Sequence, residues 1–225
     1  MFGAKKRDLP DGTVLVIGLG RFGYAAASTL LRMGIDVLAV DEREVMVQRY
    51  ASEITHIVQL DSTDPDALEQ IGVRDFDRAI VAIGSDIEAS IMTVLGLSEA
   101  GVSNIWAKAT TTRHGQILER VGATKVIYPE RSMGRRVAHM VAGNMNDFIE
   151  FDDGFSIARA IAPEFTWNKT LADSVVRSRY DVTIVGVKRP GHDLDYGRAD
   201  TVVHQGDELL VAGGTAHVEK FCLLR

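Results

Sequence analysis

Apolar residues in the first part of the chain gather in short runs, and longer amphipathic stretches separate these runs. The runs are rich in β-branched and aliphatic residues and have the length of buried strands. They cover residues 14–17, 35–41, 56–61, 78–84, 104–110 and 125–129. Helices are predicted between them, over residues 24–31, 42–53, 66–71, 87–100 and 112–121. This alternation predicts a doubly wound, Rossmann-like parallel sheet of six strands in an α/β fold.

The pattern changes after residue 131. Ser132 is predicted to cap a crossover helix that runs to about Asn146, with an apolar stripe formed by Met133, Val137, Met140, Val141 and Phe148. Shorter strands at 155–161, 182–188 and 208–213, an extended stretch at 200–203, and helices at 171–179 and 215–221 then predict a small α+β domain. We therefore expect a flexible arm (1–12), an α/β domain (13–131), a crossover helix and linker (132–152) and a C-terminal domain (153–225).

A glycine motif, Gly-x-Gly-x-x-Gly, follows the first strand directly at Gly18, Gly20 and Gly23 and leads into the first helix. The first glycine permits a tight turn, the second lets a phosphate approach the backbone, and the third lets the helix pack on the strand. The free N–H groups at the start of the helix then face an anion. A tight turn without a ligand is the alternative interpretation.

The end of the next predicted strand favours the interpretation in which the glycine motif binds a ligand. This strand ends on Asp41, about twenty residues after the glycines, where a carboxylate accepts hydrogen bonds from ribose hydroxyls. Asp41 would repel a 2′-phosphate and so disfavours NADP, although NADP is not excluded because Arg43 is nearby. Asp61 and Ser62 follow the third strand and lie at the same edge of the sheet, where ligands bind in folds of this class. The sequence thus predicts a bound adenine nucleotide.

Composition narrows the class of protein. The 25 basic and 31 acidic residues give a net charge of −6, so no nucleic-acid partner is expected. The one cysteine, Cys222, excludes an internal disulfide framework and fits a reducing cytoplasm. No stretch approaches the roughly twenty apolar residues that span a bilayer. The six histidines stand in no catalytic spacing with Asp or Arg, which predicts nucleotide binding without catalysis, and hence no enzyme.

The chain resembles the RCK family, the KtrA/TrkA-type cytosolic "regulator of K⁺ conductance" subunits of bacterial Ktr and Trk potassium uptake systems. The most specific residues of the resemblance are Arg21 inside the glycine motif and Glu130 after Pro129. The resemblance covers nearly the whole chain, through residues 18–23, 38–41, 80–84, 104–109, 126–130, 176–180 and 205–209. It implies an octameric ring of paired subunits, bound to a membrane potassium channel at the inner face of the membrane, that changes shape when ATP replaces ADP.

The resemblance also implies roles for individual residues. Arg21 would reach a γ-phosphate, and Glu130 would contribute to a divalent cation, Mg²⁺ or Ca²⁺, at a subunit interface. In some relatives the C-terminal domain binds cyclic di-AMP between two copies, with which Ile184, Arg177 and Pro190 are compatible. The candidate nucleotide-binding residues are Gly18, Gly20, Arg21, Phe22, Gly23, Asp41, Arg43, Asp61, Ser62, Ile83, Gly84, Ser85 and Lys108.

Two alternatives stay open for the function. One is an NAD-dependent oxidoreductase, for which a catalytic pair would be needed. The other is a nucleotide sensor that acts on a different transporter, such as a sodium- or chloride-coupled one. Arg43 and Asp61 could each shift the preference between ATP, ADP and NAD.

Overall fold

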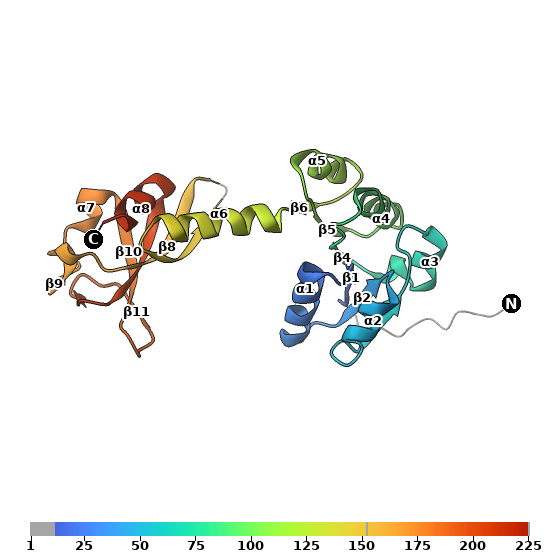
Figure 1. Cartoon of the computed structure of the whole chain (residues 1–225), viewed down its shortest axis with the longest axis horizontal. Helices are drawn as coiled ribbons and strands as arrows, with labels where there is room; N and C mark the ends of the chain where they lie inside the picture. The colour runs from blue at the N-terminus through green and yellow to red at the C-terminus, as the bar shows by residue number, and fades with distance from the viewer. Residues whose placement is uncertain (1–11, 152, 225) are drawn as a thin grey trace. The chain divides into compact units, whose positions relative to one another are not determined.

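The computed structural model describes residues 12–151 and 153–224 (Figure 1). Apart from Gly12, the predicted N-terminal arm lies outside these residues. The chain forms two compact units, Met1–Glu130 and Arg131–Arg225, which are described separately. No helix in the described ranges has both the length and the apolar character needed to cross a bilayer.

The first unit contains the predicted parallel sheet. Its strands are β1 (Val14–Ile17), β2 (Val37–Asp41), β3 (His56–Gln59), β4 (Arg78–Val81), β5 (Asn104–Lys108) and β6 (Lys125–Ile127). The helices are α1 (Arg21–Arg32), α2 (Glu44–Tyr50), α3 (Pro65–Gln70), α4 (Ile87–Glu99) and α5 (Thr112–Arg120), with a 3₁₀ turn at Val73–Asp75. The strand order is β3-β2-β1-β4-β5-β6 with parallel neighbours, which confirms the predicted fold class.

Alternation along β1 explains why helices cover both faces of this sheet. Leu15 and Ile17 pack into a core that also contains side chains of α3, α4 and α5. Val14 and Val16 point to the opposite face, into a core with side chains of α1 and α2. Accordingly, α1 and α2 lie on one side of the sheet, and α4 and α5 lie on the other (Figure 1). A strand that is buried on both faces has to be apolar throughout, as β1 is.

The strand order reverses beside β1, which pairs with β2 on one side and β4 on the other. The chain leaves β1 for α1 on one face, whereas it leaves β4 for α4 on the other face. A crevice at the carboxyl ends of the strands is typical of such a switch point. The turn after β1 is tied to both neighbours, because Gly18 N–H donates to Val40 O at 2.7 Å and Ala82 N–H donates to Ile17 O at 2.7 Å.

The crossover helix differs from its prediction at both ends. It is α6 (Pro129–Ala142), which begins at Pro129 because proline suits the first position of a helix. The prediction that it reaches Asn146 was wrong, because residues from Met145 onward form strand β7 (Met145–Glu150), which pairs antiparallel with β8 (Phe155–Ile161). Phe148 is therefore a buried strand residue and not part of the helical stripe. The predicted boundary between the linker and the C-terminal domain, at residues 152 and 153, therefore falls between β7 and β8.

The second unit is built on an antiparallel sheet of order β11-β10-β13-β8-β7 and a two-stranded ribbon, β12-β9. The remaining elements are β9 (Lys169–Thr170), α7 (Val176–Tyr180), β10 (Val182–Lys188), β11 (Leu194–Tyr196), β12 (Val202–Val203), β13 (Glu208–Gly214) and α8 (Thr215–Cys222), with a 3₁₀ turn at Glu164–Thr166. The predicted helix over 171–179 is shorter, because Ser174 Oγ donates to Leu171 O at 2.7 Å and Val175 has a φ of +46°.

The core of the second unit lies between its sheet and α8. Leu209, Val211 and Phe221 are among its buried residues, and Cys222 is buried beside them. Burial raises the pKa of the Cys222 thiol to about 12, because the thiolate would lose its hydration. The cysteine is thus a small core residue, as free cysteines commonly are.

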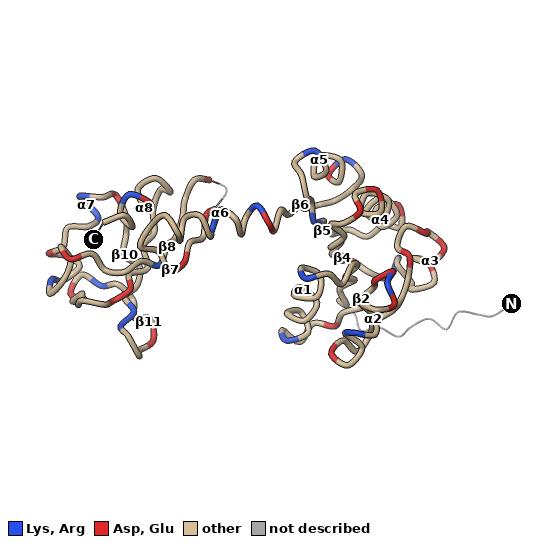
Figure 2. Tube along the Cα trace, viewed as in Figure 1, with Lys and Arg blue, Asp and Glu red and all other residues tan. Residues whose placement is uncertain are grey.

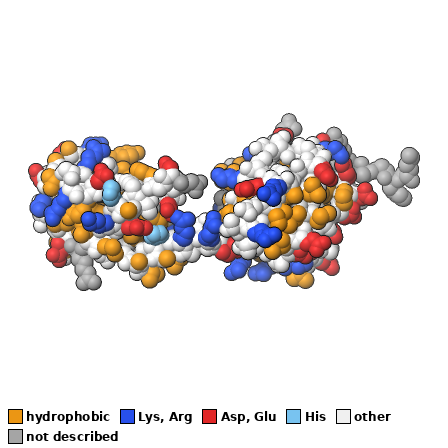
Figure 3. Space-filling model, turned by 90° about the horizontal axis from the view of Figure 1, so that it is seen from above, with side chains coloured by type: hydrophobic (Ala, Val, Ile, Leu, Met, Phe, Trp, Pro, Cys, Tyr) orange, Lys and Arg blue, Asp and Glu red, His pale blue; other side chains and the backbone are white. Residues whose placement is uncertain are grey.

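The apolar stripe of α6 is exposed within one chain. Met133, Val137 and Val141, one turn apart, are 53%, 44% and 82% exposed. Hydrophobic side chains are visible on the surface of the second unit (Figure 3). The stripe is therefore free to be covered by another molecule.

Candidate functional site

The motif that follows β1 contains three glycines, and the structure requires or permits glycine at each position for a different reason. Gly18 has a φ of +90°, and a Cβ there would lie 3.2 Å from the Ala82 carbonyl carbon. A Cβ on Gly23 would lie 1.8 Å from Gly18 O, so this position has no room for a side chain. At Gly20, no described atom beyond its immediate neighbours lies within 4 Å of the corresponding position. Packing therefore accounts for Gly18 and Gly23 but not for Gly20.

The start of α1 has free hydrogen-bond donors. Asp64, Asp86 and Thr111 cap α3, α4 and α5 by accepting backbone N–H groups, whereas α1 begins at Gly20 with no side-chain cap in the described structure. Its first turn contains no acidic residue, and Arg21 there is exposed. Free N–H groups, the positive end of the helix dipole and an arginine together favour an anion such as a phosphate.

Asp41 ends β2, next to this turn, and is only 4% exposed. Its Oδ2 accepts the N–H of Leu19 at 2.7 Å, which ties the carboxylate to the glycine turn. Its Oδ1 accepts the N–H of Arg43 at 3.0 Å. The two backbone bonds fix the carboxylate at the carboxyl edge of the sheet, where a ribose hydroxyl could reach it.

The guanidinium of Arg43 also contacts Asp41. Its Nε lies 3.1 Å from Oδ1 and its Nη2 lies 3.3 Å from Oδ2, while 57% of its side chain is exposed. Figure 2 shows acidic and basic residues side by side where β2 passes into α2. Sequence reasoning placed both residues in the site but missed their pairing, although a spacing of two residues is a signal for local contact.

Asp61 and Ser62, after β3, are partly engaged within the protein. Asp61 Oδ1 accepts hydrogen bonds from Thr63 N–H at 2.9 Å and from Thr63 Oγ1 at 2.7 Å, and these bonds lower the pKa of the Asp61 carboxyl. Ser62 Oγ is buried and lies 2.8 Å from Thr93 Oγ1 of α4. Asp61 is therefore available at the edge, whereas the Ser62 hydroxyl holds α4 to the sheet.

A charged cluster lies on the other side of the strand-order reversal from Asp41, where β4, β5 and β6 end. Lys108 Nζ lies 2.7 Å from Glu130 Oε1, and a Cβ on Gly84 would lie 2.9 Å from the same Nζ. The hydrogen bond from Lys108 holds the pKa of the Glu130 carboxyl below its ordinary value, and the charge of Arg21 adds to this effect. Arg21, Gly84, Lys108 and Glu130 are thus brought near one another, a proximity that sequence spacing alone does not reveal.

The remaining candidates line the same edge of the sheet. Phe22 is half-buried in the first turn of α1, Ile83 is half-buried against the first core, and Ser85 is exposed before α4. For Glu130, the described residues contain no cluster of three or more His, Cys, Asp or Glu that could hold a metal ion. Within the part of one chain that the structure describes, Glu130 is therefore not joined by such a set of ligands.

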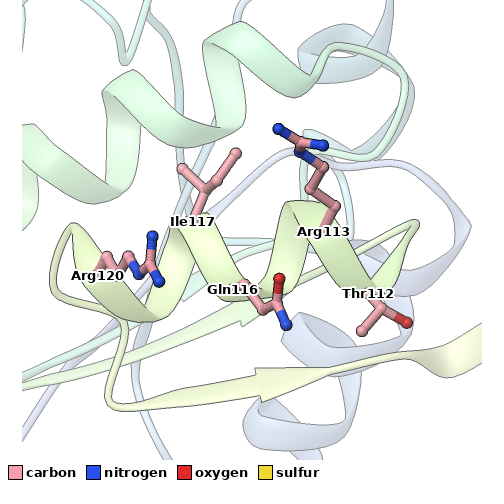
Figure 4. A pocket seen from close by; sticks show the side chains of 5 residues that line it. All are labelled: Thr112, Arg113, Gln116, Ile117 and Arg120. Atoms are coloured by element: carbon pink, nitrogen blue, oxygen red, sulfur yellow. The ribbon is translucent and has the colours of Figure 1, made fainter.

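Two other regions lie apart from this site. A depression of about 430 Å³ is lined by Thr112, Arg113, Gln116, Ile117 and Arg120 (Figure 4). It lies along α5 alone and includes no residue of the candidate site. In the second unit, Ile184 is 8% exposed in the core, and Arg177 donates to Thr183 Oγ1 at 3.2 Å. Within one chain Ile184 is thus a core residue, whereas Arg177 is exposed and bonded to a neighbouring strand residue.

Comparison with known proteins gives consistent results for both units. Residues 14–129 match the TrkA-N domain and residues 167–224 match the TrkA-C domain. The chain is 39% identical over 207 residues to Ktr system potassium uptake protein C of Bacillus subtilis (strain 168), covering 92% of this chain and 94% of that protein. It is 37% identical over 207 residues to Ktr system potassium uptake protein A of the same organism, covering 92% and 93%.

Solved structures resemble the chain in fold. The GsuK RCK domain superimposes with a TM-score of 0.69 at 20% identity, over 96% of this chain and 48% of that one. The GsuK channel bound to NAD superimposes with a TM-score of 0.69 at 18% identity, over 97% of this chain and 40% of that one. A structure of GsuK bound to ADP superimposes with a TM-score of 0.50 at 20% identity, over 56% of this chain and 34% of that one.

Proposed function

The chain belongs to the family of TrkA-N and TrkA-C domain proteins that includes the Ktr system potassium uptake proteins, and on this basis we propose that it is a nucleotide-binding regulatory subunit of a potassium uptake system. The relatives named above are transport proteins, and we infer that this chain likewise binds its nucleotide without catalysing a reaction on it.

One observation carries the nucleotide assignment. Gly20 leaves open space at the uncapped start of α1, and the buried carboxylate of Asp41 is tied to the same turn through Leu19 N–H. An adenosine phosphate has the complementary groups, because its phosphates are anions and its ribose hydroxyls are donors to a carboxylate. The NAD and ADP in the GsuK structures support this class of ligand.

The response to ATP is assigned to Arg21. This side chain is exposed in the first turn of α1, and its positive charge contributes to the lowered pKa of the Glu130 carboxyl. ADP lacks the γ-phosphate, so a guanidinium that reaches only this group would contribute to ATP binding alone. Such a difference in affinity is what allows ATP, in place of ADP, to shift an equilibrium between two shapes.

The proposal for assembly is based on α6. We propose that its exposed stripe of Met133, Val137 and Val141 packs against a second copy, and that paired copies form an octameric ring. The ring would bind a membrane potassium channel subunit on the cytoplasmic side. Glu130 and its copies would hold a Mg²⁺ or Ca²⁺ ion between subunits, and paired C-terminal domains would be the place for cyclic di-AMP.

Calorimetry on the purified chain tests the nucleotide assignment. We expect ATP, ADP or NAD to bind, and Asp41→Ala to weaken binding of the nucleotide by about 1–3 kcal/mol because the ribose loses a charged acceptor. The matched control is Asp36→Ala, an exposed carboxylate just before the opposite end of β2. Unchanged affinity in folded Asp41→Ala protein would contradict the site.

Potassium flux tests the regulatory role. We expect liposomes that contain a Ktr-type membrane subunit to take up potassium faster with this chain and ATP than with this chain and ADP. Flux that is indifferent to the chain would contradict the regulatory role even if nucleotide binds. Light scattering on the purified protein would separately report whether the particle contains eight copies.

A further inference from the structure

We propose that Arg43 competes with the nucleotide: its guanidinium covers the acceptor positions on Asp41 that the ribose hydroxyls need, and it must move away when a nucleotide binds. This inference rests on the proposed function, and it assigns to Arg43 a role in setting the affinity for the nucleotide. It predicts that the free protein holds its ribose site closed, while its phosphate site at the start of α1 is open.

The hydrogen bonds on Asp41 are the first step of the argument. A carboxylate has about four acceptor positions. Leu19 N–H and Arg43 N–H take one on each oxygen, at 2.7 and 3.0 Å. Arg43 Nε and Nη2 take a further one on each, at 3.1 and 3.3 Å. The set is therefore full, and a ribose that donates two hydroxyls to Asp41 has to displace two of these donors.

Only the side chain of Arg43 can leave. The two amide donors belong to the backbone of the glycine turn and of the β2–α2 turn, and they are fixed by the fold. The Arg43 side chain is 57% exposed; its guanidinium forms hydrogen bonds with Asp41, and the charge of Glu42 attracts it as well. It also stands at the first position before α2, where the helix dipole disfavours a positive charge.

The strength of the competition follows from this exposure. An ion pair that is more than half exposed contributes little net stability, because water screens the charges and solvates the freed guanidinium. Displacement therefore lowers nucleotide affinity by a modest factor and does not prevent binding. We expect removal of the guanidinium to tighten ADP binding about twofold to fivefold.

The experiment pairs side-chain variants with ligands that differ only in the ribose. ADP and 2′,3′-dideoxy-ADP are titrated into the wild-type chain, Arg43→Ala, Arg43→Lys and Arg49→Ala. Arg49→Ala is the matched control, because it removes the same charge from the same helix at an exposed position. Dideoxy-ADP keeps the phosphates and the adenine but offers no diol to Asp41, so it should not sense the competition.

We expect Arg43→Ala to bind ADP more tightly than the wild type and than Arg49→Ala, with no gain for dideoxy-ADP. Arg43→Lys should fall between, because an ammonium keeps the charge but lacks the planar fork. Equal or weaker ADP binding by Arg43→Ala than by Arg49→Ala, or the same gain with both ligands, would overturn the inference alone. A wild-type chain that binds no adenine nucleotide would overturn the proposed function, and this inference with it.

Discussion

The starts of α1 and α5 lie at the same edge of one sheet, but only at α5 does a side chain accept a hydrogen bond from the N–H groups of the first turn. At α5, Thr111 Oγ1 accepts the N–H of His114 at 3.1 Å, so the protein caps its own helix. At α1, the residue in the equivalent place is Gly20, which has no side chain to accept a bond. The edge of a Rossmann-like sheet thus supplies several similar helix starts, and a side-chain cap such as that of α5 uses a donor that the start of α1 leaves available to a ligand.

The difference between these two helix starts means that one contributes to the stability of the fold and the other to ligand binding. A side chain that caps α5 stabilises the fold at all times, whereas the open start of α1 is stabilised only when an anion is present. Substitutions at α5 should therefore change the free energy of unfolding, and substitutions at Gly20 or Arg21 should mainly change nucleotide affinity. Gly23 is the exception, because it belongs to the α1 turn but serves packing.

The largest effect is expected at Gly23. In Gly23→Ala the new Cβ would collide with Gly18 O, a backbone atom, so we expect the free energy of unfolding to fall by about 3 kcal/mol or more. Gly20→Ala is the matched control: its loss should stay within about 1 kcal/mol, while its nucleotide affinity falls because the methyl group fills the open space. Urea unfolding and calorimetry measure the two quantities. Equal stability losses would remove the distinction between these glycines.

A smaller effect is expected at Arg21. Arg21→Ala should lower ATP affinity more than ADP affinity, by about 1–2 kcal/mol for a charge-assisted contact, and should blunt activation of potassium flux by ATP. Arg113→Ala makes the same change in the first turn of α5 and should alter neither affinity. If Arg21→Ala weakens both nucleotides equally, or neither of them, the ATP response must have another origin.

The cap of α5 should contribute to stability only. Thr111→Ala leaves the N–H of His114 without its side-chain acceptor, and we expect a loss of about 1 kcal/mol in the free energy of unfolding. Nucleotide affinity should stay unchanged, and Thr111→Ser should recover most of the stability. A loss of ATP or ADP affinity in the folded alanine variant would show that the two helix starts are coupled.

The smallest effect concerns pH. Burial lowers the pKa of His114, which is 2% exposed and has a buried Nε2 without a hydrogen-bond partner in the described structure. Above the ordinary histidine pKa of about 6.5 both the folded and the unfolded chain carry it neutral. As the pH falls below that value, the unfolded chain gains a proton that the folded chain resists, so stability is lost until the folded pKa is passed.

Urea unfolding at several pH values tests the contribution of His114. His114→Gln, if its circular dichroism matches that of the wild type, should lose less stability than the wild type between neutral pH and pH values below about 6.5. The same pH dependence in both proteins would assign the acid sensitivity to other groups.

The fold class could be predicted because local signals agree with the tertiary structure. The run Val14–Ile17 is apolar throughout and is buried on both faces, and Gly18, Gly23 and Asp41 occupy the positions that their spacing indicates. The error at β7 arose because Phe148 also fits the helical period of the stripe, although Gly143 and Asn144 signal the end of a helix.

The pairings within the candidate site could not be predicted in the same way. Lys108 and Glu130 meet only because β5 and β6 are neighbours and α6 begins at Pro129. The fork of Arg43 on Asp41 depends on a rotamer that no sequence pattern encodes. Likewise, the open space at Gly20 is visible only once the turn is built. The nucleotide assignment of these residues stays a prediction until a ligand is bound.

The burial of Cys222 makes this chain convenient for site-directed labelling. It is the one cysteine of the sequence, it is 2% exposed, and its thiol has a pKa of about 12, so a maleimide dye at neutral pH should leave it unmodified. A cysteine introduced at an exposed site, such as Tyr196 or Met33, would be the sole reactive thiol. Fluorescent or spin probes could then report distances without replacement of the native residue.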